Sequence, residues 1–144
     1  MQAGKKICVL GSANVDSFVY VKHIPVPGET IQAEKYMIAN GGKGANQAAA
    51  VGKLAGQCVF TGQVGNDDEM RNLEKEMTEA NVELLWRKVP GVPTGKAFIY
   101  VETESGENSI VIVGGANTHY SDFNSLPEEY MKAIDKCDCV QLQK

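Results

Sequence analysis

Residues 41–54 read GGKGANQAAAVGKL, and this stretch decides how the surrounding sequence is interpreted. Alanine has the highest helix propensity, so residues 45–54 predict a helix, with glycines in front of it and Gly56 behind it. Glycine permits close approach of the backbone, and a helix N-terminus presents N–H groups without intrahelical partners. The stretch therefore predicts a helix whose N-terminus faces a polar cradle built from residues 41–44.

Short apolar runs flank this helix on both sides. Residues 6–11 (Lys-Ile-Cys-Val-Leu-Gly) form a continuous apolar run closed by glycine, which is typical of a parallel strand buried on both faces. Beyond the helix, residues 57–64 predict a strand, residues 67–80 an amphipathic helix with an acidic first turn, and residues 82–89 another strand. Residues 128–142 add a helix as far as residue 137 and then a strand. This alternation predicts an α/β fold built on a parallel sheet.

Two segments interrupt that alternation. Within residues 17–40, a strand-like run, a Pro-Val-Pro-Gly turn and a second extended run beginning at Thr30 indicate a small antiparallel sheet attached to the parallel core. Within residues 93–113, residues 96–102 and 108–113 predict a hairpin. We expect the two segments to combine into one small sheet that covers the main sheet as a lid.

Composition and charge exclude several classes of protein. The chain has 144 residues, 43% of them hydrophobic and 22% charged, which is ordinary for one soluble globular domain. Its net charge is −4 and it has no Lys/Arg block, so we expect no nucleic-acid partner and no anionic membrane surface. The apolar part of the N-terminus is too short for a signal peptide, and no apolar run approaches the roughly 20 residues of a membrane span. A cytoplasmic location is expected, with nuclear presence left open.

The four cysteines do not have the spacing of a metal site. Cys137 and Cys139 are close in sequence, but no second Cys or His pair accompanies them, and His23 and His119 lie far away. Three of the four cysteines lie in apolar segments interpreted as buried strands. We therefore expect reduced, buried thiols and no structural metal.

Two polar motifs are candidates for ligand binding. Asn14 and Asp16 follow the first core strand, and ligands of α/β sheets collect beyond the carboxyl ends of the strands, where an amide and a carboxylate can hydrogen-bond several hydroxyls of a sugar. An Asx turn is the alternative at this place. In the second motif, Gly41, Gly42, Lys43 and Asn46 form the polar cradle or, alternatively, a plain glycine-rich turn. The motif is not a P-loop or a dinucleotide fingerprint, because neither the following Ser/Thr nor the third glycine is present.

Seven short segments together point to one family. The segments are Gly11-Ser12-x-Asn14-x-Asp16, Pro27-Gly28-Glu29-Thr30, residues 41–48, Val64-Gly65-x-Asp67, Thr94-Gly95, Gly106-Glu107-Asn108 and Gly114-x-Ala116-Asn117. In their order and separations they resemble the corresponding segments of the PfkB-type, ribokinase-like family of carbohydrate kinases.

The resemblance implies a fold, an activity and a set of site residues. The fold is a ribokinase-like three-layer α/β domain, incomplete here, whose β-sheet lid also serves as a homodimer interface. The equivalents of Asn14, Asp16, Gly42, Lys43 and Asn46 contact the pentose hydroxyls. ATP, Mg²⁺ and, where one is used, a monovalent cation such as K⁺ bind mainly to a C-terminal half carrying a Gly-Ala-Gly-Asp motif, which this chain lacks. The implied reaction is ATP-dependent phosphorylation of D-ribose to D-ribose 5-phosphate in a longer parent protein, and the 144-residue chain is expected to be inactive alone.

Two departures and three alternatives accompany this interpretation. Met70 stands where the family usually has glycine, and the resemblance places an expected sugar-contacting glutamate directly after Lys144, the last residue of this sequence. The parent could instead act on a nucleoside, a deoxyribose or a ketohexose, or the chain could be a truncated, non-catalytic sugar-binding product. The third alternative is an unrelated α/β domain with chance matches.

Overall fold

Four parallel strands form the central sheet, in the order β10-β1-β4-β6. The computed structural model describes residues 5–54, 56–119 and 124–144; residues 1–4, part of the N-terminus weighed against a signal peptide, lie outside these ranges. Neighbouring residues of β1 are buried on both faces of the sheet, as predicted: Cys8 and Val9 are both fully inaccessible. The strands are β1 (Lys6–Leu10), β4 (Gln57–Thr61), β6 (Val82–Leu84) and β10 (Cys139–Leu142).

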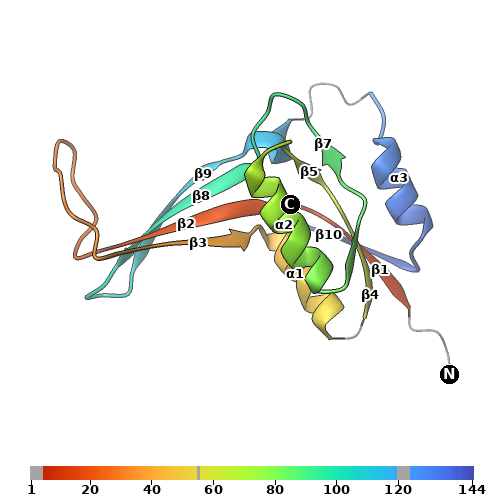
Figure 1. The fold of residues 1–144 in the computed structure, drawn as a ribbon, viewed down its shortest axis with the longest axis horizontal. Coiled ribbons are helices and arrows are strands. Elements are labelled where there is room, and N and C mark those ends of the chain that lie inside the picture. The colour runs from red at the N-terminus through yellow and green to blue at the C-terminus, as the bar shows by residue number, and fades with distance from the viewer. Residues whose placement is uncertain (1–4, 55, 120–123) are drawn as a thin grey trace.

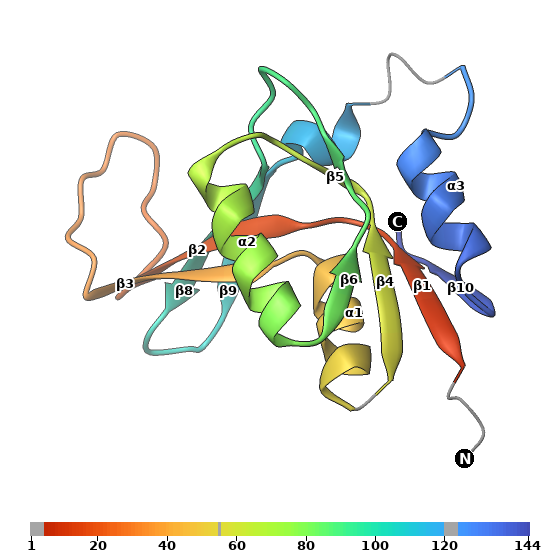
Figure 2. The same cartoon turned by 45° about the vertical axis from the view of Figure 1, so that its right-hand side comes forward.

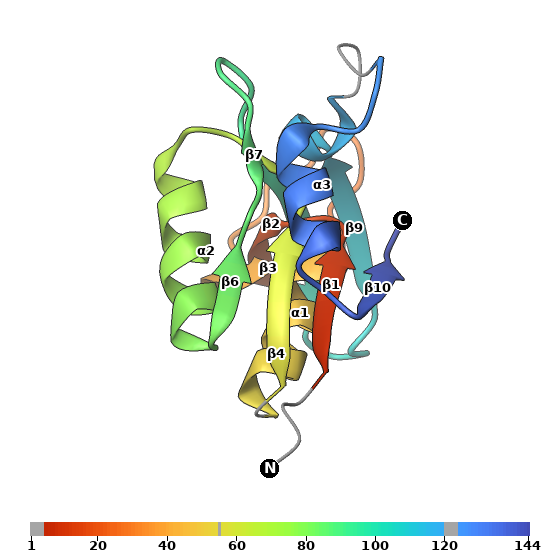
Figure 3. The same cartoon turned by 90° about the vertical axis from the view of Figure 1, so that its right-hand side faces the viewer.

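Helices cover both faces of this sheet, which confirms the predicted three-layer α/β fold (Figure 3). On one face, α1 (Lys43–Lys53) and α2 (Asp68–Glu79) enclose the larger core cluster. On the other face, Ala133 of α3 (Glu128–Asp135) packs with Cys8 and Val59. Within the described ranges, no helix is long and apolar enough to cross a membrane.

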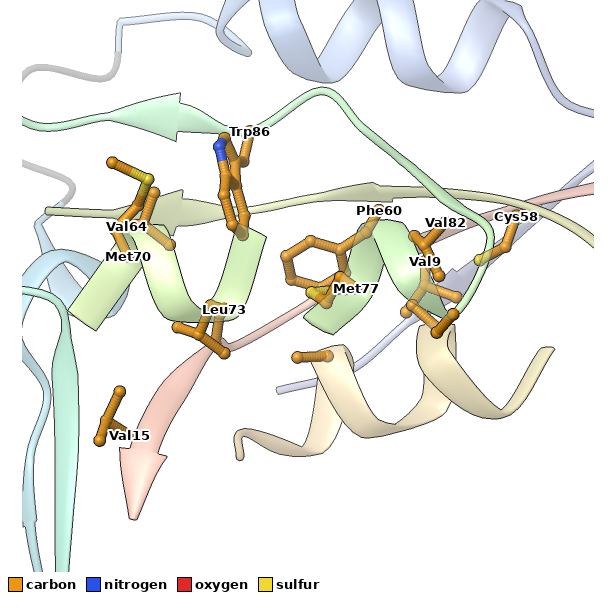
Figure 4. Close-up of a cluster of buried hydrophobic side chains, with 14 residues drawn as sticks. Val9, Val15, Cys58, Phe60, Val64, Met70, Leu73, Met77, Val82 and Trp86 are labelled. Carbon is orange, nitrogen blue, oxygen red and sulfur yellow. The ribbon is translucent and has the colours of Figure 1, made fainter. Parts of the chain in front are cut away.

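The larger core cluster is centred on Phe60 (Figure 4). Phe60 is fully buried, and its ring meets that of Trp86 edge to face with 6.2 Å between the ring centroids. The apolar stripe predicted for the second helix is confirmed, because Met70, Leu73 and Met77 all point from α2 into this cluster. Met70, at the position where a glycine was expected, therefore contributes to the core.

Two predicted strands are each divided in the structure. Residues 57–64 form β4 and then β5 (Gln63–Val64), while residues 82–89 form β6 and then β7 (Arg87–Lys88). β5 and β7 pair in a separate two-stranded sheet. The second division occurs where Trp86 turns into the core against Phe60, which removes it from the strand ladder.

A second sheet extends away from the central one, in the order β3-β2-β8-β9 (Figures 1 and 2). We call it the projecting sheet. The antiparallel pairing predicted within residues 17–40 and the hairpin predicted within residues 93–113 are both present. The two pairs join through β2 and β8, which run parallel, with Asn14 opposite Gly95. The second extended run begins at Lys35 and not at Thr30, since residues 31–33 form no ladder. The strands are β2 (Asn14–Val21), β3 (Lys35–Gly41), β8 (Gly95–Glu102) and β9 (Asn108–Val113).

The cysteines differ in exposure. Cys8 and Cys58 are buried, and burial raises the pKa of each thiol to about 11. Cys139 is exposed because it lies on β10, the edge strand, so the expectation of buried thiols was wrong at this position. All four thiols are free, and the described residues contain no group of His, Cys, Asp or Glu side chains arranged to hold a metal ion.

Candidate functional site

The two predicted polar motifs meet at the junction between the sheets. Asn14 and Asp16 lie in β2, which begins three residues earlier than the predicted strand at Ser17, so they occupy a regular strand and not a turn. Asn14 is directly opposite Gly41, the last residue of β3. The chain then passes through Gly42 into α1, as the resemblance and the glycine spacing predicted.

Close packing at Gly41 and Gly42 brings the motifs together. A side-chain carbon on Gly41 would overlap the Asp16 carboxylate, and one on Gly42 would come within 2.7 Å of the Ala13 Cα. Gly42 is the N-cap of α1 and has φ 91°, a backbone conformation that favours glycine. Backbone conformation and packing therefore favour glycine at position 42, and the Asp16 side chain fills the space beside position 41.

Lys43 and Asn46 complete the set of predicted residues. Both lie in the first turn of α1 and are exposed to solvent. The backbone N–H of Ala45 donates to the carbonyl of Ser12 at 3.0 Å, which fixes this turn beside the segment that leads into Asn14. The structure thus brings all six predicted site residues to one junction: Asn14, Asp16, Gly41, Gly42, Lys43 and Asn46.

Asp16 carries a half-buried carboxylate at this junction. Burial removes water from the carboxylate and raises its pKa above the ordinary value for aspartate. Among the residues that the structure describes, no protein group donates a hydrogen bond to it. A partly desolvated carboxylate without a protein donor has free lone pairs, which makes Asp16 suited to accepting hydrogen bonds from the hydroxyl groups of a ligand.

Asn117 orients Asn14. It lies in η1 (Gly115–Thr118), and its amide oxygen accepts from the N–H of Ala13 at 2.9 Å. Its amide nitrogen donates to Asn14 Oδ1 at 2.7 Å, and also to the carbonyls of Ala13 and Gly114. Because Asn14 Oδ1 is used in this way, the NH₂ group of Asn14 is left to donate to a ligand.

Sequence reasoning did not assign a site role to Asn117 or to Gln143. Gln143 Oε1 accepts from both the N–H and the hydroxyl of Ser12, at 3.0 and 2.8 Å. For Asn117, the sequence signal was its place in the Gly114-x-Ala116-Asn117 motif. Gln143 had no such signal, because it reaches Ser12 only when β10 pairs with β1 in the sheet.

Asp67 joins the projecting sheet to α2. Its carboxylate accepts from the N–H and the hydroxyl of Thr94, each at 2.7 Å, and from the N–H of Met70 at 2.9 Å. The Thr94 hydroxyl in turn accepts from the N–H of Gly65 at 3.0 Å. Burial alone would raise the pKa of Asp67, but these hydrogen bonds outweigh burial and lower it. Thr94 directly precedes β8, so this network fixes one end of the projecting sheet.

A surface hollow lies elsewhere. It has a volume of about 580 Å³ and is lined by residues 22–23 and 31–34, in the loop between β2 and β3. These residues are at the opposite end of β2 from Asn14. The concentration of donors and acceptors at the junction, and not the size of a cavity, therefore identifies the candidate site.

The junction does not fit the cofactors that the resemblance implied. Mg²⁺ prefers several oxygen ligands, whereas the six candidate residues include a single carboxylate, that of Asp16. The described residues also contain no cluster of metal-ligating side chains. The glycine-rich segment also lacks the Ser or Thr of a P-loop. The described residues therefore present a candidate binding site for a polar molecule and no complete phosphoryl-transfer site.

Comparison with known proteins finds similar sugar kinases. The chain is 36% identical to the ribokinase of Haemophilus influenzae over 140 residues, which is 96% of this chain and 45% of that protein. It is 39% identical to the deoxyribokinase of Salmonella typhi, covering 95% and 44% of the two chains. The structure of Arabidopsis thaliana ribokinase complexed with ribose and ATP superimposes with a TM-score of 0.87 at 34% identity, over 99% of this chain and 46% of that one.

The chain thus spans less than half the length of these relatives. A family model described as pfkB family carbohydrate kinase matches residues 4–143, nearly the whole sequence. The chain therefore belongs to the pfkB family of carbohydrate kinases.

Proposed function

We propose that this chain is the sugar-binding part of an ATP-dependent kinase that phosphorylates D-ribose at its 5-hydroxyl to give D-ribose 5-phosphate. The observation that carries this proposal is the Asp16 carboxylate, which is half-buried and lacks a protein donor within the described residues. The 36% identity to a ribokinase and the overlap with a ribokinase complexed with ribose and ATP support the same substrate class.

The chemistry of the junction suits a neutral polyol. Asp16 accepts hydrogen bonds from sugar hydroxyls, while the Asn14 amide and the Lys43 ammonium donate to sugar oxygens. A carboxylate within the site repels a substrate that already carries phosphate, so the site favours the unphosphorylated sugar. In this proposal the six residues seat the acceptor sugar, with Gly41, Gly42 and Asn46 shaping the cradle.

The reaction itself requires groups beyond these. Phosphoryl transfer needs a general base for the attacking hydroxyl, a clamp for the γ-phosphate and bound Mg²⁺. ATP and these groups belong, in the proposal, to the rest of a longer kinase, in which a monovalent cation such as K⁺ is a further candidate. We therefore expect no ribose-dependent release of ADP from ATP by the 144-residue chain. The parent kinase would work in the cytoplasm, where ATP is abundant.

The projecting sheet is the proposed lid and homodimer interface. It joins the core next to Asp16, and its strands β3, β8 and β9 expose large apolar side chains that water does not favour. A second copy of the same sheet would cover them, and sedimentation equilibrium would test the resulting dimer. The exposed apolar residues are Tyr36, Met37, Ile38, Phe98, Ile110, Val111, Ile112 and Val113.

A deoxypentose is the second candidate substrate, because the chain is 39% identical to a deoxyribokinase. The two sugars differ in the 2-hydroxyl alone. A site that hydrogen-bonds this hydroxyl discriminates against the deoxy sugar, since a buried polar group would then lack its partner.

Ligand-induced thermal stabilisation tests the proposal. A ligand that binds only the native state raises the melting temperature. We expect D-ribose to stabilise the chain, and D-fructose and adenosine to leave its Tm unchanged. A larger effect of 2-deoxy-D-ribose than of ribose would support the second candidate, while no effect of any sugar on a cooperatively folded chain would contradict both.

A further inference from the structure

Helix α2 contacts the base of the projecting sheet on the face opposite Asp16. Val15 of β2 pairs with Asn40 of β3 and with Lys96 of β8, so the three residues form one row across the sheet. Successive residues of a strand point to opposite faces, which places this row on the reverse of Asp16. Val15 is 6% exposed and belongs to the core cluster that also contains Leu73 of α2 (Figure 4).

Polar contacts flank Val15 on both sides. On β3, Asn40 Nδ2 donates to Glu76 Oε2 at 2.6 Å and to the carbonyl of Asn72 at 3.2 Å. On β8, Lys96 Nζ donates to Glu69 Oε1 at 2.6 Å, and this contact lowers the pKa of Glu69. Glu69 and Glu76 are seven residues apart, about two helical turns, so they lie on the same side of α2. Each neighbour of β2 is therefore attached to a different turn of the same helix.

Nearer the core, the sheet is also held by Val15, which packs into the core cluster, and by Asn117, which donates to Asn14 at the start of β2. Farther from the core its outer strands are exposed, and every residue of β9 is accessible to solvent. The Asp67–Thr94 network fixes only the first residue before β8, so a change in the angle of the sheet turns about this point. Rotation about that end would displace Asp16 from the N-terminus of α1 unless Glu69 and Glu76 keep their partners.

We propose that Glu69 and Glu76 are positioning residues that set the angle of the projecting sheet and thereby hold Asp16 over the N-terminus of α1. This inference rests on the proposed function, because the advantage of a fixed angle is a pre-organised sugar site. Neither glutamate contacts the sugar, and each acts through its partner on the sheet, Lys96 or Asn40.

Paired substitutions separate this role from a general effect on the helix. The test variants are Glu69→Gln, Glu76→Ala and the double variant. The control for the first is Asp68→Asn, which removes an exposed acid from the same helical turn, where it pairs with Arg71. The control for the second is Glu74→Ala, which removes a glutamate of α2 that pairs with Lys88. Among the described residues, its side chain forms no hydrogen bond or ion pair with the projecting sheet.

Two measurements are made on each variant. Amide hydrogen exchange without ligand reports the attachment of the sheet, and calorimetric titration with D-ribose reports the site. We expect faster exchange in residues 35–41 and 95–102, and a Kd for ribose raised about threefold by each single variant and about tenfold by the double, as for loss of partly exposed charged contacts. The controls leave both measurements unchanged, and the exchanged pair Glu69→Lys with Lys96→Glu restores the native Kd.

Native exchange and native affinity in the double variant would overturn the inference, as would equal effects of the controls. Failure of the proposed function looks different. In that case the native chain itself shows no ribose binding, whereas the exchange measurement still reports whether the two glutamates hold the sheet.

Discussion

The central sheet and the projecting sheet use the same backbone hydrogen bonding but differ in what surrounds them. In the central sheet, Cys8, Val9 and Val59 are fully buried between helices. In the projecting sheet, Ile112 is 67% exposed and β9 is accessible along its whole length. Burial of apolar surface therefore stabilises the first region, whereas the second depends on its strand ladder and on contacts with α2. The candidate site lies where the two regions join.

The largest expected effect comes from substitution in the central region. Phe60→Ala removes a fully buried ring that contacts Trp86, and it should lower the free energy of unfolding by about 3–5 kcal/mol. Ile112→Ala on the projecting sheet should cost less than about 0.5 kcal/mol in the monomer, since its side chain is already exposed. Urea denaturation measures both. Equal losses of unfolding free energy in the two variants would contradict the stated difference between the two sheets.

A glycine at the junction should show the next largest effect. Gly42→Ala combines φ 91° with overlap against Ala13 and Ser12, and we expect a loss of about 3 kcal/mol together with loss of ribose binding. Gly28→Ala is the matched control, because Gly28 has φ 85° but no atom within 4 Å of the added carbon. It should cost about 1 kcal/mol from backbone strain alone. Similar losses at both positions would mean that close packing at Gly42 is unimportant.

Asn117 tests the connection between the hairpin of the projecting sheet and Asn14. Asn117→Ala removes the hydrogen bonds to Ala13 and Asn14 and should lower the free energy of unfolding by about 2 kcal/mol. It should also weaken ribose binding, because the Asn14 amide loses its fixed orientation. The exposed Asn66, changed to alanine, serves as the control. Native ribose affinity in Asn117→Ala would exclude the orienting role.

The smallest effect concerns pH and the Asp67 network between the two regions. The pKa of Asp67 is lower in the folded chain than in the unfolded one, since the hydrogen bonds from Thr94 and Met70 favour the carboxylate. Its contribution, about 1 kcal/mol or less, is therefore present above the unfolded pKa and is lost as the pH falls through the folded value. Asp67→Asn should flatten the acid side of a stability–pH profile. An unchanged slope would contradict this assignment.

The sequence predicted the central region better than the projecting one. Continuous apolar runs and the stripe Met70, Leu73 and Met77 identify buried elements directly, because the spacing of apolar residues along the chain indicates which side chains are buried. The parallel pairing of β2 with β8 joins residues about 80 positions apart, and no local pattern encodes it. The division at Trp86 was missed for the same reason, since it depends on a contact with Phe60.

The candidate site was predicted in part. Glycine spacing marked Gly41 and Gly42, whose surroundings admit no side chain, and the polar residues beside them followed from the motifs. The supporting residues Asn117 and Gln143 act through contacts with Asn14 and Ser12 that appear only once the sheets are assembled. Supporting residues that are distant in sequence from the site therefore could not be predicted from local sequence patterns.

Calorimetric titration of the chain with D-ribose tests most directly whether Asp16 binds the sugar. Native protein is compared with Asp16→Asn and with the control Asp68→Asn, which changes an exposed acid. We expect saturable binding of one ribose per chain and native affinity in the control. In Asp16→Asn the affinity should fall at least about tenfold, because a charged hydrogen-bond acceptor is lost. A folded native chain that binds no ribose, or an Asp16→Asn variant that binds it as the native chain does, would contradict the account.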